Sequence, residues 1–211
     1  MPGGENNNKI IAGLLAIIIL IAVITLIYVN LPADENDNVT TDDTTEETND
    51  EQDEEPEEDI FSIVFNDTSI QYSLSELEGL ELYTANATLI KVGWLPEIKT
   101  EGPNKYTGVK ITTLLEQVNL LPENYTINVT SSDGWTTGFI KSQIQGNVNI
   151  YNETGVIIDN SGATMILAYK IDGEYFTEED TGPLRVVFCH EYMTASNIWP
   201  KMVNSIEIIE Q

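Results

Sequence analysis

The chain contains one cysteine and one histidine, and these two residues are neighbours, Cys189 and His190. A thiol next to an imidazole suggests nucleophilic catalysis, in which the base removes the thiol proton. The pair follows an apolar run, residues 184–188, that is typical of a strand, and adjacent side chains of a strand point to opposite faces. We therefore expect Cys189 to be a small buried residue and His190 to be a loop or edge residue, and we predict no catalytic residue.

The same count limits metal chemistry. One cysteine and one histidine cannot form a Cys₄, Cys₂His₂ or His₃ centre, and a single cysteine forms no intrachain disulfide. Carboxylates near Tyr175 and Phe176 could offer further ligands, but a solvated turn between two strands is the preferred explanation for them: Glu174, Glu178, Glu179 and Asp180. We predict no metal site, and we expect Trp94, Trp135 and Trp199 to be core or rim aromatics.

Charge excludes one class of partner. The 211 residues carry 9 Lys+Arg against 35 Asp+Glu, a formal net charge of −26, and a phosphate backbone attracts bases and repels carboxylates. We therefore predict no nucleic-acid partner. Residues 31–59 hold 15 of the acids and no base, whereas residues 60–211 hold 19 acids and 8 bases, a net charge of −11.

Residues 10–29 form an uncharged apolar run, and 20 helical residues span about 30 Å, the thickness of a bilayer core. The run is longer than the apolar core of a signal peptide, and no small-residue cleavage site follows it. We predict a retained transmembrane anchor, with a removed signal peptide as the alternative. Lys9 then places residues 1–9 in the cytoplasm as a short stub and the C-terminal domain outside a single-pass cell-membrane protein.

Residues 30–59 are predicted to be an acidic disordered linker, since they offer little apolar surface to bury and their like charges repel. A weak cation-binding strip is the alternative interpretation. Beyond the apolar run lie six N-x-Ser/Thr sequons, which are candidate glycosylation sites of an outer, glycosylated protein, although chance polar turns explain them too. The asparagines are Asn38, Asn66, Asn86, Asn124, Asn128 and Asn152.

Residues 60–211 read as short strands separated by turns, with one or two helices. Strands are expected at 61–65, 69–72, 82–94, 126–130, 135–140, 165–171, 184–189 and 205–209, with a short capped helix at 73–77. Gly102-Pro103 is expected to break the chain, and the best helix to run from Thr107 or Gly108 to Val118, before Pro122. The prediction is an α+β, mixed and mainly antiparallel β domain, preceded by one transmembrane helix.

Three segments within this domain occur in a familiar order. They are 106–115 (YTGVKITTLL), 131–135 (SSDGW) after a short strand, and 166–169 (ILAY) followed by Asp172-Gly173 and 181–187 (TGPLRVV). Over residues 69–208 the chain resembles the oxidoreductase molybdopterin-binding domain of the sulfite-oxidase type, in a short, membrane-anchored, archaeal-like form. The resemblance implies a mixed sheet and a molybdenum ion held by a pterin dithiolene and one cysteine.

The sequence departs from that family where the chemistry lies. The family's cysteine precedes the helix that matches 109–118, and no cysteine precedes position 189 here. The family meets the pterin phosphate with several Arg, Lys and His side chains, whereas this chain has one arginine and one histidine. The candidate cofactor-binding residues are Arg185, Lys110 and Trp135.

We therefore expect no cofactor, with molybdopterin bound only if the family activity is retained. The predicted function is a binding or interaction module, held in the membrane by residues 10–29, for an unidentified extracytoplasmic ligand or protein. Two alternatives remain open. The first is a molybdopterin-dependent oxidoreductase with a degraded site, and the second is a structural component of the cell envelope. Enzymatic activity is left undecided, with the missing cysteine weighing against it.

Overall fold

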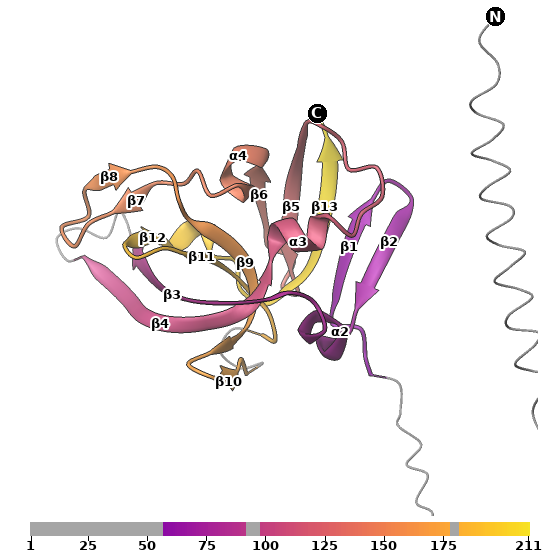
Figure 1. Ribbon diagram of the computed structural model, residues 1–211, viewed down its shortest axis with the longest axis horizontal. Helices are drawn as coiled ribbons and strands as arrows, with labels where there is room; N and C mark the ends of the chain where they lie inside the picture. The colour runs from indigo at the N-terminus through magenta and orange to yellow at the C-terminus, as the bar shows by residue number, and fades with distance from the viewer. Residues whose placement is uncertain (1–56, 92–97, 178–181) are drawn as a thin grey trace, which may run out of the picture. The chain divides into compact units, whose positions relative to one another are not determined.

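The computed structural model describes residues 57–91, 98–177 and 182–211, and residues 53–211 belong to one compact unit (Figure 1). The predicted anchor at 10–29, most of the acidic linker, Trp94, and three of the acids near Tyr175 lie outside the described residues. Within the described ranges, no helix has the length and apolar character needed to cross a membrane.

A five-stranded sheet joins the two ends of the domain. Its strand order is β2-β1-β13-β5-β6, in which β1 pairs with β13 in parallel and the other pairs are antiparallel. The strands are β1 (Phe61–Phe65), β2 (Thr68–Tyr72), β5 (Tyr125–Ser131), β6 (Thr136–Ile140) and β13 (Val203–Glu210). Residues of β5 alternate between buried and half-buried, as the alternating sequence predicted for a strand that lies against a core.

A second sheet contains eight strands in the order β10-β9-β4-β3-β12-β7-β8, with β11 also paired to β9. The strands are β3 (Leu82–Lys91), β4 (Lys99–Lys110), β7 (Ile150–Tyr151), β8 (Ile157–Asp159), β9 (Thr164–Ile171), β10 (Glu174–Tyr175), β11 (Arg185–Cys189) and β12 (Met193–Ala195). Strand β9 pairs with β4 on one side and with β11 on the other. All of β11 and the middle of β9 are buried, so their continuous apolar sequences reflect burial on both faces.

The helices are short. They are α2 (Leu74–Glu78), α3 (Ile111–Leu115), α4 (Lys141–Ile144) and the 3₁₀ turn η1 (Ser196–Ile198). The expected capping box is present at α2: the Glu76 amide donates to Ser73 Oγ at 3.3 Å, and the Ser73 amide donates to Glu76 Oε2 at 2.8 Å.

Two sequence predictions in this region are wrong. Gly102-Pro103 does not break the chain but lies inside β4, and Thr107 to Lys110 form the end of that strand, so the helix shortens to α3. The physical reason is that residues 107–110 pair with β9 on one side and β3 on the other, so tertiary pairing overrides the local helical spacing. The apolar stripe is real, since Val109, Ile111 and Leu114 are all buried.

One hydrophobic core unites the two sheets. It contains Ile63, Ile127 and Ile206 from the five-stranded sheet together with Val109, Leu167 and Val187 from the eight-stranded sheet. The predicted class, a mainly antiparallel β domain with few helices, is confirmed.

Candidate functional site

Arg185, the only arginine in the chain, is the first residue of β11 and lies inside the domain with 2% of its surface exposed. Its backbone pairs with Ala168 of β9. Its guanidinium lies over the Trp199 ring, 5.1 Å from the ring centroid. The Trp199 indole is held in turn, because its Nε1–H donates to Thr194 Oγ1 at 2.8 Å. The arginine is therefore fixed in position by packing and by a cation–π contact.

The hydrogen bonding of Arg185 is incomplete. Its Nη1 donates to Glu101 Oε1 at 3.3 Å, longer than a good charge-assisted bond of about 2.7–2.9 Å. Its Nε is buried and has no hydrogen-bond partner among the described residues. A buried donor without a partner is unfavourable by about 1–3 kcal/mol, so an acceptor that reached Nε would be bound favourably.

The hydroxyl of Tyr106, on β4, is a second buried polar atom without a partner in the described ranges. Asn104 lies near this hydroxyl, but the two groups lack hydrogen-bonding geometry. Burial raises the pKa of Tyr106, so the phenol stays protonated near neutral pH. Its ring packs edge-on against Trp199, with 5.6 Å between ring centroids, so Tyr106 and Arg185 share one aromatic neighbour.

A cavity of about 350 Å³ opens beside this arginine. Its wall is apolar and aromatic at Ile171, Tyr175 and Phe176, and charged at Arg185, Glu101 and Lys201. We call it the Arg185 cavity. Its volume lies at the lower end of the range for small-molecule sites, about 300–1,000 Å³, and its mixed wall is typical of such sites.

A larger groove, of about 740 Å³, lies between β3, β4 and the β7–β8 turn. Its lining includes Glu153, Glu191 and several hydroxyl side chains. Neither of the two unpartnered buried polar atoms found in the described part of the chain belongs to its lining. The Arg185 cavity is therefore the better candidate site.

The other two predicted cofactor-binding residues do not line the Arg185 cavity. Lys110 lies at the end of β4, where its Nζ is 3.5 Å from Glu81 Oε1 and lies over the ring of Tyr83. Trp135 is 70% exposed in the turn between β5 and β6, and its backbone amide donates to Asp133 Oδ1. Of the three candidates, only Arg185 combines burial with an unsatisfied donor.

The structure places Cys189 and His190 in different surroundings. Cys189 is buried at the end of β11, and burial raises the pKa of its thiol to about 12. The His190 ring is half-buried, and its Nδ1 accepts a hydrogen bond from the Tyr192 amide at 3.0 Å. Within the described residues, no group of three or more His, Cys, Asp or Glu side chains is arranged to hold a metal ion.

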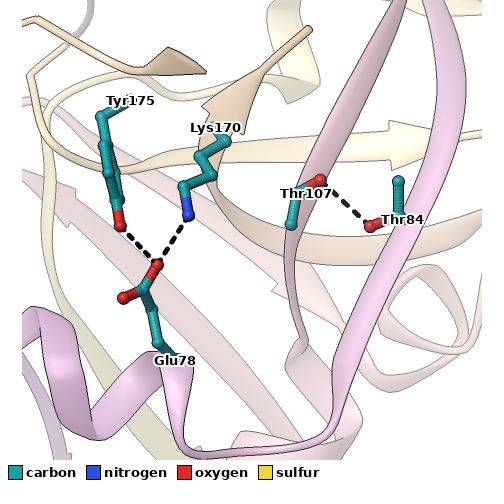
Figure 2. A network of polar contacts seen from close by, with 5 residues as sticks. All are labelled: Glu78, Thr84, Thr107, Lys170 and Tyr175. Carbon is teal, nitrogen blue, oxygen red and sulfur yellow. Dashed lines mark hydrogen bonds and ion pairs between the residues drawn. The ribbon is translucent and has the colours of Figure 1, made fainter. Parts of the chain in front are cut away.

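A polar network that shares Tyr175 with the cavity wall ties α2 to the second sheet (Figure 2). Glu78 Oε1 accepts hydrogen bonds from Lys170 Nζ at 2.8 Å and from the Tyr175 hydroxyl at 2.7 Å. The same lysine lies 4.1 Å from the centroid of the Tyr175 ring. Nearby, the Thr84 and Thr107 hydroxyls are 3.0 Å apart and join β3 to β4. The network satisfies its own charges and connects elements, so we interpret it as structural.

A family model described as the oxidoreductase molybdopterin binding domain matches residues 60–211. The chain belongs to this family. Among solved structures, the sulfane dehydrogenase SoxCD from Paracoccus pantotrophus has a similar fold, with a TM-score of 0.50 and 16% identity. That match covers 72% of this chain but 38% of the SoxCD chain, so the likeness concerns the fold alone. No curated protein matches.

The residues present do not fit the cofactor that the molybdopterin-binding family implies. The family resemblance implies a cysteine thiolate on the molybdenum, and the one cysteine here is buried at the end of β11 and does not line the Arg185 cavity. A pterin phosphate is usually met by several bases, whereas here a single arginine lines the cavity and Lys110 and Lys170 each pair with a glutamate elsewhere. The resemblance to the family is therefore one of fold and not of donor set.

The sequence marks Arg185 as a candidate but gives no sign of the residues around it. A single arginine in the apolar run 184–188 was a usable signal, because a buried arginine needs partners. Glu101 and Tyr106 carried no comparable signal. They lie on β4, and only the strand order β4-β9-β11 brings them near Arg185.

The sequons occupy different environments. Asn66, Asn86 and Asn124 are exposed, Asn128 is half-buried within β5, and Asn38 lies outside the described residues. The sixth, Asn152, is half-buried, and its side-chain oxygen accepts hydrogen bonds from the Thr154 amide and hydroxyl and from the Val156 amide. Glycosylation at these sites stays a prediction.

Proposed function

We propose that this protein is a cofactor-free member of the molybdopterin-binding oxidoreductase family, and that it serves as a binding module on the outer face of the cell membrane. The observation that carries the proposal is Arg185. Its guanidinium is fully buried, has a donor without a partner in the described ranges, and lines a cavity of ligand size. A donor that the fold leaves unsatisfied beside a cavity is the signature of a site that a ligand completes.

The chemistry of Cys189 supports the absence of the cofactor. Molybdenum is a high-valent ion that a soft thiolate stabilises, and the chain's one cysteine is enclosed by the core. Moving Cys189 to a metal would require unpacking the end of β11, whose residues are all buried.

The proposed location rests on the sequence outside the described residues. The uncharged run at 10–29 is long enough to span a bilayer, and Lys9 before it favours a cytoplasmic N-terminus. The sequons beyond the run, three of them exposed, are consistent with an outer domain.

One alternative has a specific observation in its favour. The family match spans the whole domain, which supports an oxidoreductase that keeps molybdopterin in a degraded site. A test separates the two functions. The full chain is produced in a host that makes molybdopterin, purified in detergent, and oxidised in acid, and the released pterin is measured by its fluorescence.

A known molybdopterin enzyme prepared in parallel from the same host is the control. We expect the control to release about one pterin per chain and this protein to release none above background. A near-stoichiometric yield from this protein would contradict the proposal and favour the oxidoreductase.

A further inference from the structure

We infer that the Arg185 cavity binds a small carboxylate with an apolar body. This inference rests on the proposed function, because it requires that the cavity hold no pterin. The unsatisfied donor of Arg185 defines the ligand first. Arginine Nε–H is a donor only, so the atom that completes it must be an acceptor. The Tyr106 hydroxyl is also buried without a partner among the described residues and its ring shares Trp199 with Arg185, but it does not line the cavity, so Arg185 alone defines the ligand's acceptor.

The charge and geometry of the guanidinium select among acceptors. Arginine presents its N–H groups as a planar fork that matches the two oxygens of a carboxylate. The ring of Trp199 supports one face of the guanidinium, which holds the plane of the fork. A neutral carbonyl would satisfy one donor and leave the positive charge with Glu101, at 3.3 Å, as its one ion-pair partner among the described residues.

The Glu101 carboxylate already occupies part of the position beside Arg185 that the ligand's carboxylate would take. It makes one long contact, to Nη1, and leaves Nε without a partner among the described residues. The Glu101 side chain is 40% exposed, against 3% for the arginine side chain. It therefore can turn toward water when a better-placed carboxylate enters, whereas Arg185 cannot move. Glu101 also competes with an anionic ligand by charge.

The rest of the cavity wall determines the polarity and size of the part of the ligand that lies beyond the carboxylate. Ile171, Tyr175 and Phe176 face the cavity with apolar and aromatic surface, and the cavity of about 350 Å³ holds a compact molecule. The domain as a whole carries a net charge of −11, so a ligand with a single carboxylate and an apolar body is repelled less than a polyanion.

The chain offers an unusually direct probe, because Arg185 is its only arginine. Full-length protein labelled with ¹⁵N-arginine and purified in detergent gives one Nε–Hε cross-peak in a ¹H–¹⁵N spectrum. Samples first shown to be pterin-free are titrated with sodium benzoate, with sodium phosphate, or with sodium chloride at matched ionic strength. We expect a saturable shift with benzoate and no comparable shift with chloride.

Two matched variants test the role of Glu101. Glu101→Gln removes the competing charge in the cavity, and Glu81→Gln removes the same charge at the Lys110 surface pair, where Glu81 is 69% exposed. We expect Glu101→Gln to lower the Kd for benzoate by roughly fivefold, the scale of one exposed ion pair, and Glu81→Gln to leave it unchanged.

The outcomes separate the two claims. Pterin in the purified protein would contradict the proposed function itself. In pterin-free protein, a benzoate shift no larger than that of chloride would overturn the carboxylate inference alone, as would saturable binding of phosphate without benzoate. An equal decrease in the Kd for benzoate in both variants would show that the overall negative charge of the domain, and not Glu101 in particular, opposes the ligand. It would overturn the claim that Glu101 occupies the ligand's place beside Arg185.

Discussion

At the scale of single residues, the glycine of the turn between β5 and β6 isolates a backbone effect. Gly134 has φ of +86°, and a Cβ added there would meet no atom within 4 Å. Gly134→Val should lower the free energy of unfolding by about 1–3 kcal/mol, because a β-branched residue is strained at positive φ. Gly134→Asn should lose less, since asparagine tolerates this region. Equal urea midpoints for the wild type and the Val variant would contradict the positive φ of Gly134 in this turn.

Gly108 lies where the backbones of β4 and β9 approach each other closely. A Cβ at Gly108 would lie 2.1 Å from the Leu167 carbonyl oxygen, where β4 meets β9 at an irregular register. Gly108→Ala should lower the free energy of unfolding by about 1–3 kcal/mol or more, because backbone must shift. Gly138→Ala on β6 is the control, since its added Cβ would meet only Asn128 Oδ1 at 3.5 Å. Similar urea midpoints for the two variants would show that β4 and β9 do not meet as described.

At the scale of elements, the Glu78 network gives a pH-dependent prediction. Hydrogen bonds from Lys170 and Tyr175 lower the pKa of Glu78 below its ordinary 4.5. The stabilisation is therefore complete above that ordinary pKa and is lost as the pH falls through the lowered pKa. Glu78→Gln should lower the urea midpoint slightly at a pH above the ordinary pKa of Glu78, and the difference should vanish once the pH falls below the lowered pKa. A difference that grew in acid would contradict the assignment.

Some strands could be predicted from the sequence, and others could not. Strands β1, β5, β9 and β11 were predictable because alternation or a continuous apolar run marks each of them. Strands β7 and β10 have two residues each, too few for any period to appear. The parallel pairing of β1 with β13 joins distant parts of the chain, and no local pattern records it. The candidate site shows the same limit. Arg185 stands out in the local sequence, whereas its neighbours on β4 come from a distant part of the chain and carry no local signal.

At the scale of the whole molecule, the apolar run at 10–29 predicts how the protein partitions. If it is a retained anchor, the protein should stay in the membrane pellet after alkaline carbonate extraction and leave it only in detergent. A chain that begins at residue 60 should appear in the soluble fraction, as the matched control. Release of the full protein by carbonate, with a mature N-terminus near Asp34, would contradict the anchor and favour a removed signal peptide.

The central claim is that the family fold persists here without the family's metal. The most direct test is the molybdenum content of the full chain, purified from a host that makes the cofactor and measured by mass spectrometry as metal per protein. We expect a ratio near zero, unchanged in Cys189→Ser, because the only thiol is buried in the core. A ratio near one that falls in Cys189→Ser would contradict the account and assign the protein to the molybdenum enzymes.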